Sequence, residues 1–487
     1  MRRHLFLSFS LQLVFIFILL PANLAAQSVP SEKTQMPLPN LTLSVSSGLE
    51  NGSQQGTEGQ NLSATMQGMT LEQLQQIALT NNPTLGQAKA GVNAARGLTH
   101  QAGLWPNPTV GYVGEEIRGG FFGGGQQGVF IQQNVILGGK LALDRKARAE
   151  EGEQAEAEVG EQKLRVENGV RVAFYEALAA QQMVEMRKKL NDLAKDAVET
   201  TRQLFNVGQA DQPDVLQAQV EADEADLAAI TSEQEQQRAW QVLAAVVGMP
   251  ELPLAKLLGN LEELPEINSD QMVQTILSTS PAAKIAQTGV ARAGAELQRA
   301  RREVVPDLSL RAGYMNDLEQ LGSVPSRAVG SEGFAEVGVN LRLFNRNQGN
   351  IEAARANQER ASFEVQRVSL VLRQLAAPIL QSYASSRAIA DRYKTRTLPN
   401  ARQAYQLYLQ KYQEGAAAYP QVLIAQRTLF QLEASYIGTL ENLWIDAATL
   451  QGLLLTDGLG LPTAPGEFDR PVREINMPVT ENPGGRQ

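Results

Sequence analysis

Residues able to do chemistry are scarce in this chain of 487 residues. It contains no cysteine and only two histidines, and His4 lies in an N-terminal segment with the pattern of an export signal. Thiolate chemistry is therefore excluded, and most metal and acid–base catalysis lacks its usual side chain. We find no nucleophile–base pair, no phosphate-binding loop and no cluster of metal ligands in the sequence. We therefore expect no enzyme activity, no cofactor and no metal site.

The most informative polar residues are three acids that flank two predicted helix breaks. Asp211 and Asp214 lie in the segment 205–219, and Glu414 lies in the segment 412–426. Both segments place a glycine, which suits a left-handed helix cap, a few residues before a proline, which suits the first turn of a new helix. Each segment therefore predicts the tip of a helical hairpin. The simplest role of acids at such a place is helix capping and solvation.

The two tips are copies within a larger internal repeat. Each copy begins with an aromatic residue and ends with Val-Leu-x-Ala-Gln, and three pairs align between them: Gly208 with Gly415, Ala210 with Ala417, and Pro213 with Pro420. Prolines 83 and 281 also align, as do prolines 108 and 306. Duplication explains this spacing. We therefore predict a first repeat at 69–260 and a second at 261–461, each with a helix, two strands and a long helical hairpin.

The segments outside the repeats have the composition of an export signal, a linker and a tail. Residues 1–26 combine two arginines, an apolar run and a small-residue cleavage site, which predicts a secretory signal. The run is short for an uncleaved membrane anchor. Gln27 stands where a lipoprotein signal needs cysteine, so we expect no lipid anchor. Residues 27–68 predict a flexible linker, and 462–487 a disordered tail.

Four runs alternate between apolar and polar residues as strands do. They are 109–115, 129–137, 307–314 and 334–343, with predicted loops at 119–125 and 318–331. Alternation over this length is typical of tilted membrane strands. A soluble hairpin with one solvent-exposed face would have the same pattern. The export signal and the repeat favour the interpretation as membrane strands.

One long helix and one return helix make up the rest of each repeat. The long ones are predicted at 140–205 and 347–412, with kinks at Pro378 and Pro399, and the return helices at 214–247 and 420–455. Each long helix would measure roughly 100 Å at 1.5 Å per residue. Apolar residues at three- and four-residue spacing predict helices packed side by side. An all-α bundle would explain the helices but not the strands or the export signal.

Four strands cannot close a barrel, and open sheet edges are not tolerated in lipid. We therefore predict a homotrimer. The fold class is mainly α with a β-barrel portion: a trimeric outer-membrane barrel with four strands per chain, twelve in all, continuous with a long periplasmic α-helical coiled-coil barrel. Outer-membrane lipid is then a partner. The net charge of −9 argues against nucleic acid.

This chain resembles the TolC family of outer-membrane efflux proteins. The resemblance spans about residues 69–461 and rests on the two tips, the aligned prolines and the strand-to-helix turns. The turns are Leu-Gly-Gly-Lys at 137–140 and Phe-Asn-Arg-Asn-Gln-Gly-Asn at 344–350. They are most similar to the CzcC-type branch, which serves cation-exporting pumps of the resistance–nodulation–division (RND) type.

The resemblance implies a passive duct in the outer membrane that joins an RND pump through a periplasmic adaptor. Metal cations are the implied substrate, and drugs or other small molecules are the alternative. A structural periplasmic coiled-coil protein is the alternative of a different class, and a periplasmic enzyme would lack a site. The adaptor is expected at the tips, on residues Phe205, Val207, Gly208, Ala210, Pro213, Tyr412, Gly415, Ala416, Ala417 and Pro420.

In the TolC family, charged residues just past the tips close the tunnel mouth. Asp214 matches the first-half aspartate of that pattern, whereas Gln421 and Ile424 stand where the second-half aspartates would be, and Ala417 replaces an arginine. The remaining gate candidates are Asp214, Glu414 and Asp211. Closure by apolar contact through Ile424, Tyr412 and Tyr419 is the alternative.

Overall fold

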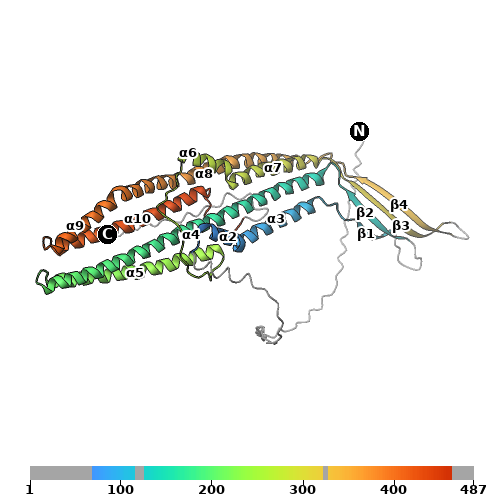
Figure 1. Cartoon of the computed structure of the whole chain (residues 1–487). Helices are drawn as coiled ribbons and strands as arrows, with labels where there is room; N and C mark the ends of the chain where they lie inside the picture. Colours follow the sequence, from blue (N-terminus) through green and yellow to red (C-terminus); the bar gives the residue numbers. More distant parts are fainter. Residues whose placement is uncertain (1–67, 116–124, 322–326, 463–487) are drawn as a thin grey trace, which may run out of the picture. The chain divides into compact units, whose positions relative to one another are not determined.

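The computed structural model describes residues 68–115, 125–321 and 327–462. The export signal, nearly all of the predicted linker and tail, and parts of both strand loops lie outside the described residues. The described elements are, in chain order (Figure 1), α2 Leu71–Asn81, α3 Pro83–Ala102, β1 Thr109–Glu115, β2 Gln126–Val135, α4 Lys140–Asn206, α5 Gln212–Val247, α6 Ser269–Thr279, α7 Pro281–Arg302, β3 Leu308–Leu321, β4 Arg327–Val339, α8 Gln348–Arg392, the π-helical turn η1 Tyr393–Thr397, α9 Leu398–Gln413 and α10 Tyr419–Gln451.

Both repeats begin with the same pair of helices, and local capping sets their boundaries. Thr70 and Gln73 form a capping box at the start of α2, and the Asn82 side chain accepts from the Thr84 amide just before α3. In the second repeat Asn268 caps α6, and Pro281 occupies the first turn of α7. A proline lacks the amide that would be unpaired there anyway. The helix predicted at the opening of each repeat is thus present as two helices, with a proline at the start of the second.

The long helices follow the predicted spans, with one difference at the prolines. α4 is continuous over 67 residues. Its counterpart is divided into α8 and α9 by η1, which ends just before Pro399. Pro399 has no amide to donate to the preceding turn, and its ring crowds that turn. The widened π-helical turn relieves this crowding. Pro378 lies inside α8 without a break in the assigned helix.

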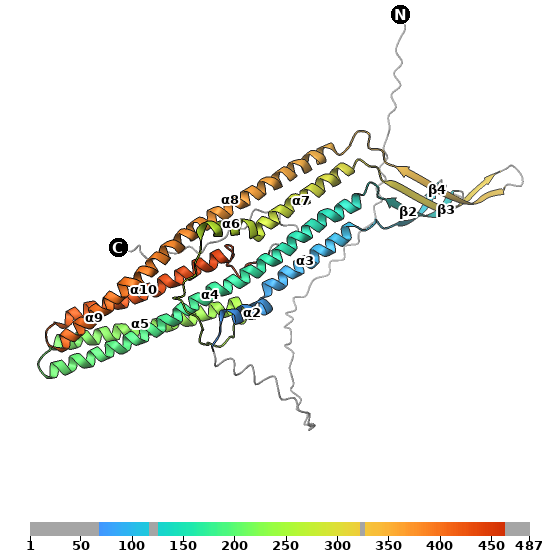
Figure 2. The same cartoon turned by 45° about the horizontal axis from the view of Figure 1, so that its top comes forward.

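The helices pack side by side around α4. α4 contacts α3, α5, α7 and α10, and α7 also lies along α8 (Figure 2). The main core lies where α2, α4, α5, α8 and α10 meet, and its central side chains are fully or nearly fully buried: Leu74, Phe174, Leu243, Leu372 and Leu443. Each such side chain contributes roughly 1.5–3 kcal/mol. Among the described residues, no helix is long and apolar enough to cross a membrane.

The four strands form one antiparallel sheet in the order β1-β2-β3-β4. The central pairing of β2 with β3 joins the two repeats, and β1 and β4 are the edges. β1 has its predicted bounds, whereas β3 and β4 extend into the predicted loop at 318–331. Backbone pairing persists to Leu321 and Arg327. It does not require the alternation of apolar and polar side chains from which the strands were predicted.

β4 ends at Val339 rather than at the predicted Leu343. Val339 pairs with Leu308, the first residue of β3, and Pro306 just before it has no amide to donate to a ladder. The chain beyond Val339 instead turns toward α8.

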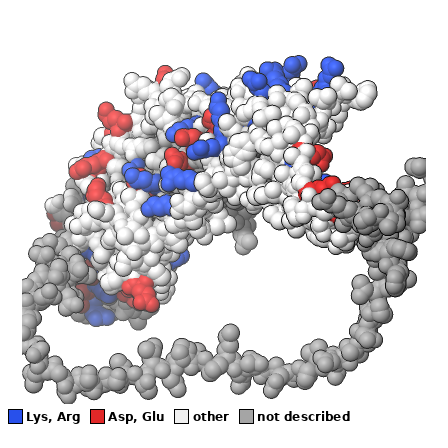
Figure 3. All heavy atoms as spheres, turned by 90° about the vertical axis from the view of Figure 1, so that its right-hand side faces the viewer, with Lys and Arg blue, Asp and Glu red and all other residues white. Residues whose placement is uncertain are grey.

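The two faces of the sheet differ as the alternation predicted. One face exposes large apolar side chains, including Val110 (73% exposed), Tyr112, Val129, Ile131, Tyr314, Val337 and Val339. The other face carries Gln132, Arg311 and Glu336 in one cross-strand row. A space-filling view toward the strand end shows charged side chains in small groups among uncharged surface (Figure 3).

Candidate functional site

The two predicted tips are built from the same backbone bonds. Gly208 and Gly415 have φ of +73° and +70°, the left-handed region that glycine adopts without strain. The next amide in each copy reaches back across the final turn, from Gln209 to Leu204 oxygen and from Ala416 to Lys411 oxygen, both at 2.8 Å. A Cβ added at either glycine would meet nothing within 4 Å. These glycines therefore serve the turn and leave open space around it.

The predicted docking residues mostly lie at the surface of the tips. Val207 is 70% exposed and Phe205 is 43% exposed. The others at least partly exposed are Gly208, Ala210, Pro213, Gly415, Ala416, Ala417 and Pro420. Tyr412 is the exception, with 5% exposed.

Asp211 and Asp214 make the contacts of a helix cap, and Glu414 pairs with a neighbouring glutamine side chain. Asp211 precedes α5, and its amide donates to Asp214 Oδ2 at 3.2 Å. Glu414 follows α9, and its Oε1 accepts from Gln410 Nε2 at 2.8 Å. Asp211 and Glu414 are exposed, and Asp214 is half-buried. Within one chain, the structure brings Asp211 and Asp214 together and places Glu414 on the other tip.

Tyr412 and Tyr419 are buried, which corrects their expected place in an apolar mouth. Their ring centroids lie 5.4 Å apart in a second apolar cluster with Ala218, Tyr405, Val422 and Leu429. Burial, with smaller effects of Tyr412 and Glu221, raises the pKa of Tyr419 to about 12. Both rings therefore hold the two hairpins together inside the chain. Ile424 remains 66% exposed.

The spacing of three tyrosines is a signal in the sequence for this cluster. Tyr405, Tyr412 and Tyr419 recur every seven residues, the period of a buried helical seam. Because the tip interrupts the helix between Tyr412 and Tyr419, the spacing alone did not indicate that the rings share one core.

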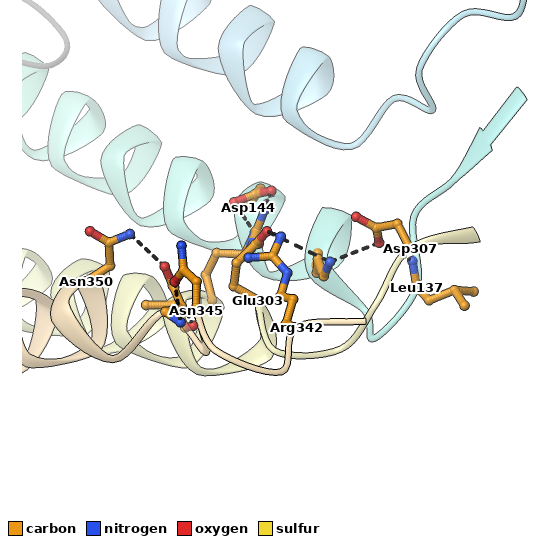
Figure 4. Close-up of polar contacts among 11 residues, drawn as sticks. Leu137, Asp144, Glu303, Asp307, Arg342, Asn345 and Asn350 are labelled. Atoms are coloured by element: carbon orange, nitrogen blue, oxygen red, sulfur yellow. Dashed lines mark hydrogen bonds and ion pairs between the residues drawn. The ribbon is translucent and has the colours of Figure 1, made fainter. Parts of the chain in front are cut away.

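A second polar site lies where the strands meet the helices (Figure 4). Lys140, the first residue of α4, has a side chain only 1% exposed. Its Nζ lies 2.9 Å from Asp307 Oδ1 and 4.0 Å from Glu303 Oε1. The Leu137 amide donates to the same Asp307 oxygen at 3.0 Å. Lys140 therefore fastens the β2–α4 turn to the α7–β3 turn.

Glu303 continues this network toward the β4–α8 turn. It pairs with Arg299 and Arg342, and Arg299 Nε also lies 2.8 Å from Asp144 Oδ1. Partial burial acts to raise the pKa of Glu303, but the hydrogen bond from Arg299 and the charges of Arg299, Lys140 and Arg342 lower it overall. Likewise, burial acts to raise the pKa of Asp307, and its bonds to Lys140 and the Leu137 amide outweigh it, so that pKa is lowered.

Asn347 completes the junction on the α8 side. It precedes α8 with a φ of +62°, which asparagine tolerates better than most residues. Its Nδ2 donates to Ala300 oxygen at 2.9 Å, and Asn350 Nδ2 donates to Asn347 Oδ1 at 2.6 Å. The two turn motifs at 137–140 and 344–350 thus meet at one place. In the sequence these motifs served only as marks of resemblance, and they did not predict the ionic partners of Lys140.

A metal site is not built from the usual ligands in the described part of the chain. No group of three or more His, Cys, Asp or Glu side chains there is placed to hold an ion. The network at the junction pairs each carboxylate with a cation instead. Its role is structural: the ion pairs fix the orientation of the strands relative to the helices.

The helices and sheet together have the fold of solved outer-membrane channels. A solved structure of CusC, described for its transmembrane channel formation, superposes with a TM-score of 0.64 at 19% identity, covering 81% of this chain and 93% of that one. The outer membrane protein VceC of Vibrio cholerae superposes with a TM-score of 0.63 at 19% identity, covering 80% and 96%. The predicted fold, mainly helical with a small antiparallel sheet, is confirmed.

The family model described as outer membrane efflux protein matches residues 74–249 and 272–454. This chain belongs to that family and is an outer-membrane efflux protein. The cobalt-zinc-cadmium resistance protein CzcC of Cupriavidus metallidurans is 28% identical over 392 residues, covering 79% of this chain and 90% of that protein. The resemblance to the TolC family and its CzcC-type branch is confirmed, and so is the outer-membrane location. The family and the matched structures are channels rather than enzymes.

Proposed function

We propose that this protein is a trimeric exit duct for metal cations, fed by an inner-membrane RND pump through a periplasmic adaptor. One observation carries the choice of substrate: the similarity to a cobalt-zinc-cadmium resistance protein extends over 90% of that protein. The repeat boundaries at 69–260 and 261–461, the cleaved signal and the absence of a lipid anchor are part of this proposal.

Two surfaces that no described part of the chain covers support assembly into a trimer. The sheet ends in open edges at β1 and β4, and a spanning sheet in lipid needs those backbone groups paired. A row of exposed apolar residues also follows α5: Leu216 (55% exposed), Val220 (49%), Leu227 (64%) and Ile230 (50%). Their spacing is that of a helical seam, and within the described residues it has no partner. Three copies would supply twelve strands and a partner for each seam.

The tips are the proposed adaptor site and gate. The open space around Gly208 and Gly415 and the exposed Val207 favour contact with another hairpin end. In a trimer any acid that faces the axis occurs three times, and rings of carboxylates favour cations. We assign that role first to Asp214, then to Glu414 and Asp211, with Ile424 as an apolar neighbour.

The experiment compares a host lacking the gene with the same host carrying the wild-type gene. We expect deletion to raise cell content of zinc, cobalt and cadmium and to lower tolerance of these ions, and the gene to restore both. Retention of organic toxicants with unchanged metal content would assign the duct to drugs or other small molecules. In detergent, a particle mass of three chains is expected, and a membrane-embedded monomer would contradict the assembly.

A further inference from the structure

One row of residues crosses all four strands with a regular alternation of size. Gly111 pairs with Phe130, Phe130 pairs with Gly313, and Gly313 pairs with Phe334. Successive side chains of a strand alternate between faces, so this row lies on the face opposite Val110, Val129 and Ala312. It therefore belongs to the polar face of the sheet.

The phenylalanine rings in this row lean across the neighbouring glycines. A Cβ built on Gly111 would lie 2.6 Å from Phe130 Cζ, and one built on Gly313 would meet Phe334 Cε1. Real Cβ atoms do not approach other atoms so closely, so each ring occupies the space that a side chain on the adjacent strand would need. Glycine is thus what allows the rings to lie along the sheet rather than stand away from it.

The flattened rings also hold a charged side chain from the next row. The Arg311 guanidinium carbon lies 4.2 Å from the Phe130 ring centroid and 5.5 Å from that of Phe334. Arg311 Nη1 lies 3.7 Å from Glu336 Oε2, and the Arg311 side chain is 29% exposed. Stacking on aromatic faces is favourable for a guanidinium. It also fixes the positive charge beside the sheet.

The location of this face follows from the opposite one. The apolar face of a membrane strand meets lipid and the polar face meets the lumen. In the proposed trimer the row would line the exit duct three times, and any cation leaving would pass it. This step rests on the proposed function.

We propose that the row of Gly111, Phe130, Gly313 and Phe334, with Arg311, determines the conductance and ion preference of the exit. The glycines let the rings lie against the wall, and the rings keep Arg311 out of the path. A methyl group on Gly111 would displace the Phe130 ring from the sheet. The Arg311 guanidinium, which stacks on that ring, would then be released toward the lumen. The lumen of the duct would become narrower, and the positive charge of Arg311 would face departing cations.

The test is single-channel recording of the purified full-length trimer in planar bilayers with potassium chloride. We expect Gly111→Ala to lose conductance and shift the reversal potential toward anions, and Phe130→Ala in the same chain to restore conductance. Arg311→Gln should shift the reversal potential the opposite way, toward cations. Gly338→Ala is the matched control, since its Cβ would meet Ser309 Cβ at an ordinary 3.7 Å on the same face. Gly111 is preferred to Gly313, whose Cβ would also meet Val129 backbone oxygen at 2.6 Å.

The outcomes separate this inference from the proposed function. A wild-type protein without channels would contradict the duct itself. Normal channels together with a Gly111→Ala variant of wild-type conductance and reversal potential would overturn the inference. If Gly111→Ala does not assemble, Phe130→Ala decides, because it removes atoms and frees Arg311. A shift of the Phe130→Ala reversal potential toward anions supports the proposal, and a reversal potential equal to that of wild type rejects it.

Discussion

The acidic residues and glycines at the tips act first on their own helices. Asp214 accepts from the amide of Asp211, and Gly208 and Gly415 occupy left-handed backbone conformations. A capping contact does not prevent a carboxylate from also acting on ions at a tunnel mouth. Substitutions that keep the local contact while changing charge or size can separate the two roles.

At the mouth we expect Asp214→Asn combined with Glu414→Gln to reduce cation selectivity and weaken block by multivalent cations. The amide oxygens can still accept from Asp211 and Gln410, so both local hydrogen bonds persist while the charges are lost. Reversal potentials in planar bilayers measure the effect, with the exposed Glu251→Gln as control. Unchanged selectivity would leave these carboxylates as caps and assign closure to apolar contacts such as Ile424.

At the tip turn we expect both Gly208→Val and Gly208→Asn to abolish efflux while trimers still reach the membrane. Valine adds bulk and strain of about 1–2 kcal/mol, whereas asparagine adds bulk in a conformation that it tolerates. Export assays with parallel trimer quantification distinguish these effects. Normal export by Gly208→Asn would show that only the backbone conformation matters and that the adaptor does not need a small residue.

Among the elements, the strand-to-helix junction has the densest ionic contacts. Lys140 begins α4, Glu303 follows α7, Asp307 precedes β3 and Arg342 follows β4. Because these residues lie at element ends, their pairing orients strands and helices rather than stabilising any one of them. The lowered pKa values of Glu303 and Asp307 mean that their contribution is present above their ordinary pKa and is lost as pH falls through the lowered values.

We expect Lys140→Met to destabilise the junction by about 3 kcal/mol, because it leaves Asp307 and Glu303 beside a buried apolar group. Heat-induced dissociation of trimers and protease access at the turns measure the loss. Lys146→Met on the exposed side of α4 is the matched control and should behave as wild type. Equal stability of the two variants would show that the junction is held by backbone contacts alone.

At the scale of the whole molecule, carboxylates from three helices interact within the bundle. Burial, the nearby Glu176 of α4 and the weaker Glu235 of α5 raise the pKa of Glu441 in α10 to about 7, against the opposing charge of Arg238. Burial also raises the pKa of Glu176. A carboxyl whose folded pKa is raised stabilises the fold fully below its unfolded pKa. That contribution is lost as pH rises through the folded pKa.

We therefore expect stability to fall between about pH 4.5 and 7, by on the order of 2 kcal/mol per chain after allowance for solvent screening. Glu441→Gln should remove most of this slope because it cannot ionise. Thermal melting across that pH range measures it, and the exposed Glu185→Gln is the control. A slope in Glu441→Gln equal to that of wild type would assign the pH dependence elsewhere.

Local sequence was sufficient wherever the deciding contacts are local. The glycines at 208 and 415 marked both tips, and the prolines that follow them, Pro213 and Pro420, lie in the first turns of α5 and α10. Each feature acts within one helical turn, so composition and spacing contain the whole physical argument. The same holds for β1, whose alternation alone placed it correctly.

Tertiary structure decided what depends on distant partners. In the sequence Lys140 is an ordinary lysine at the start of a helix. Its partner Asp307 lies 167 residues away and contacts it only in the folded chain. Tyr412 and Tyr419 could have faced the mouth, and only the packing of two hairpins placed them inside. The Gly111–Phe130 contact likewise exists only through strand register. Sequence by itself determined which segments form helices and strands. Only the fold determined which of their faces meet, because burial and pairing energies depend on residues brought together from both repeats.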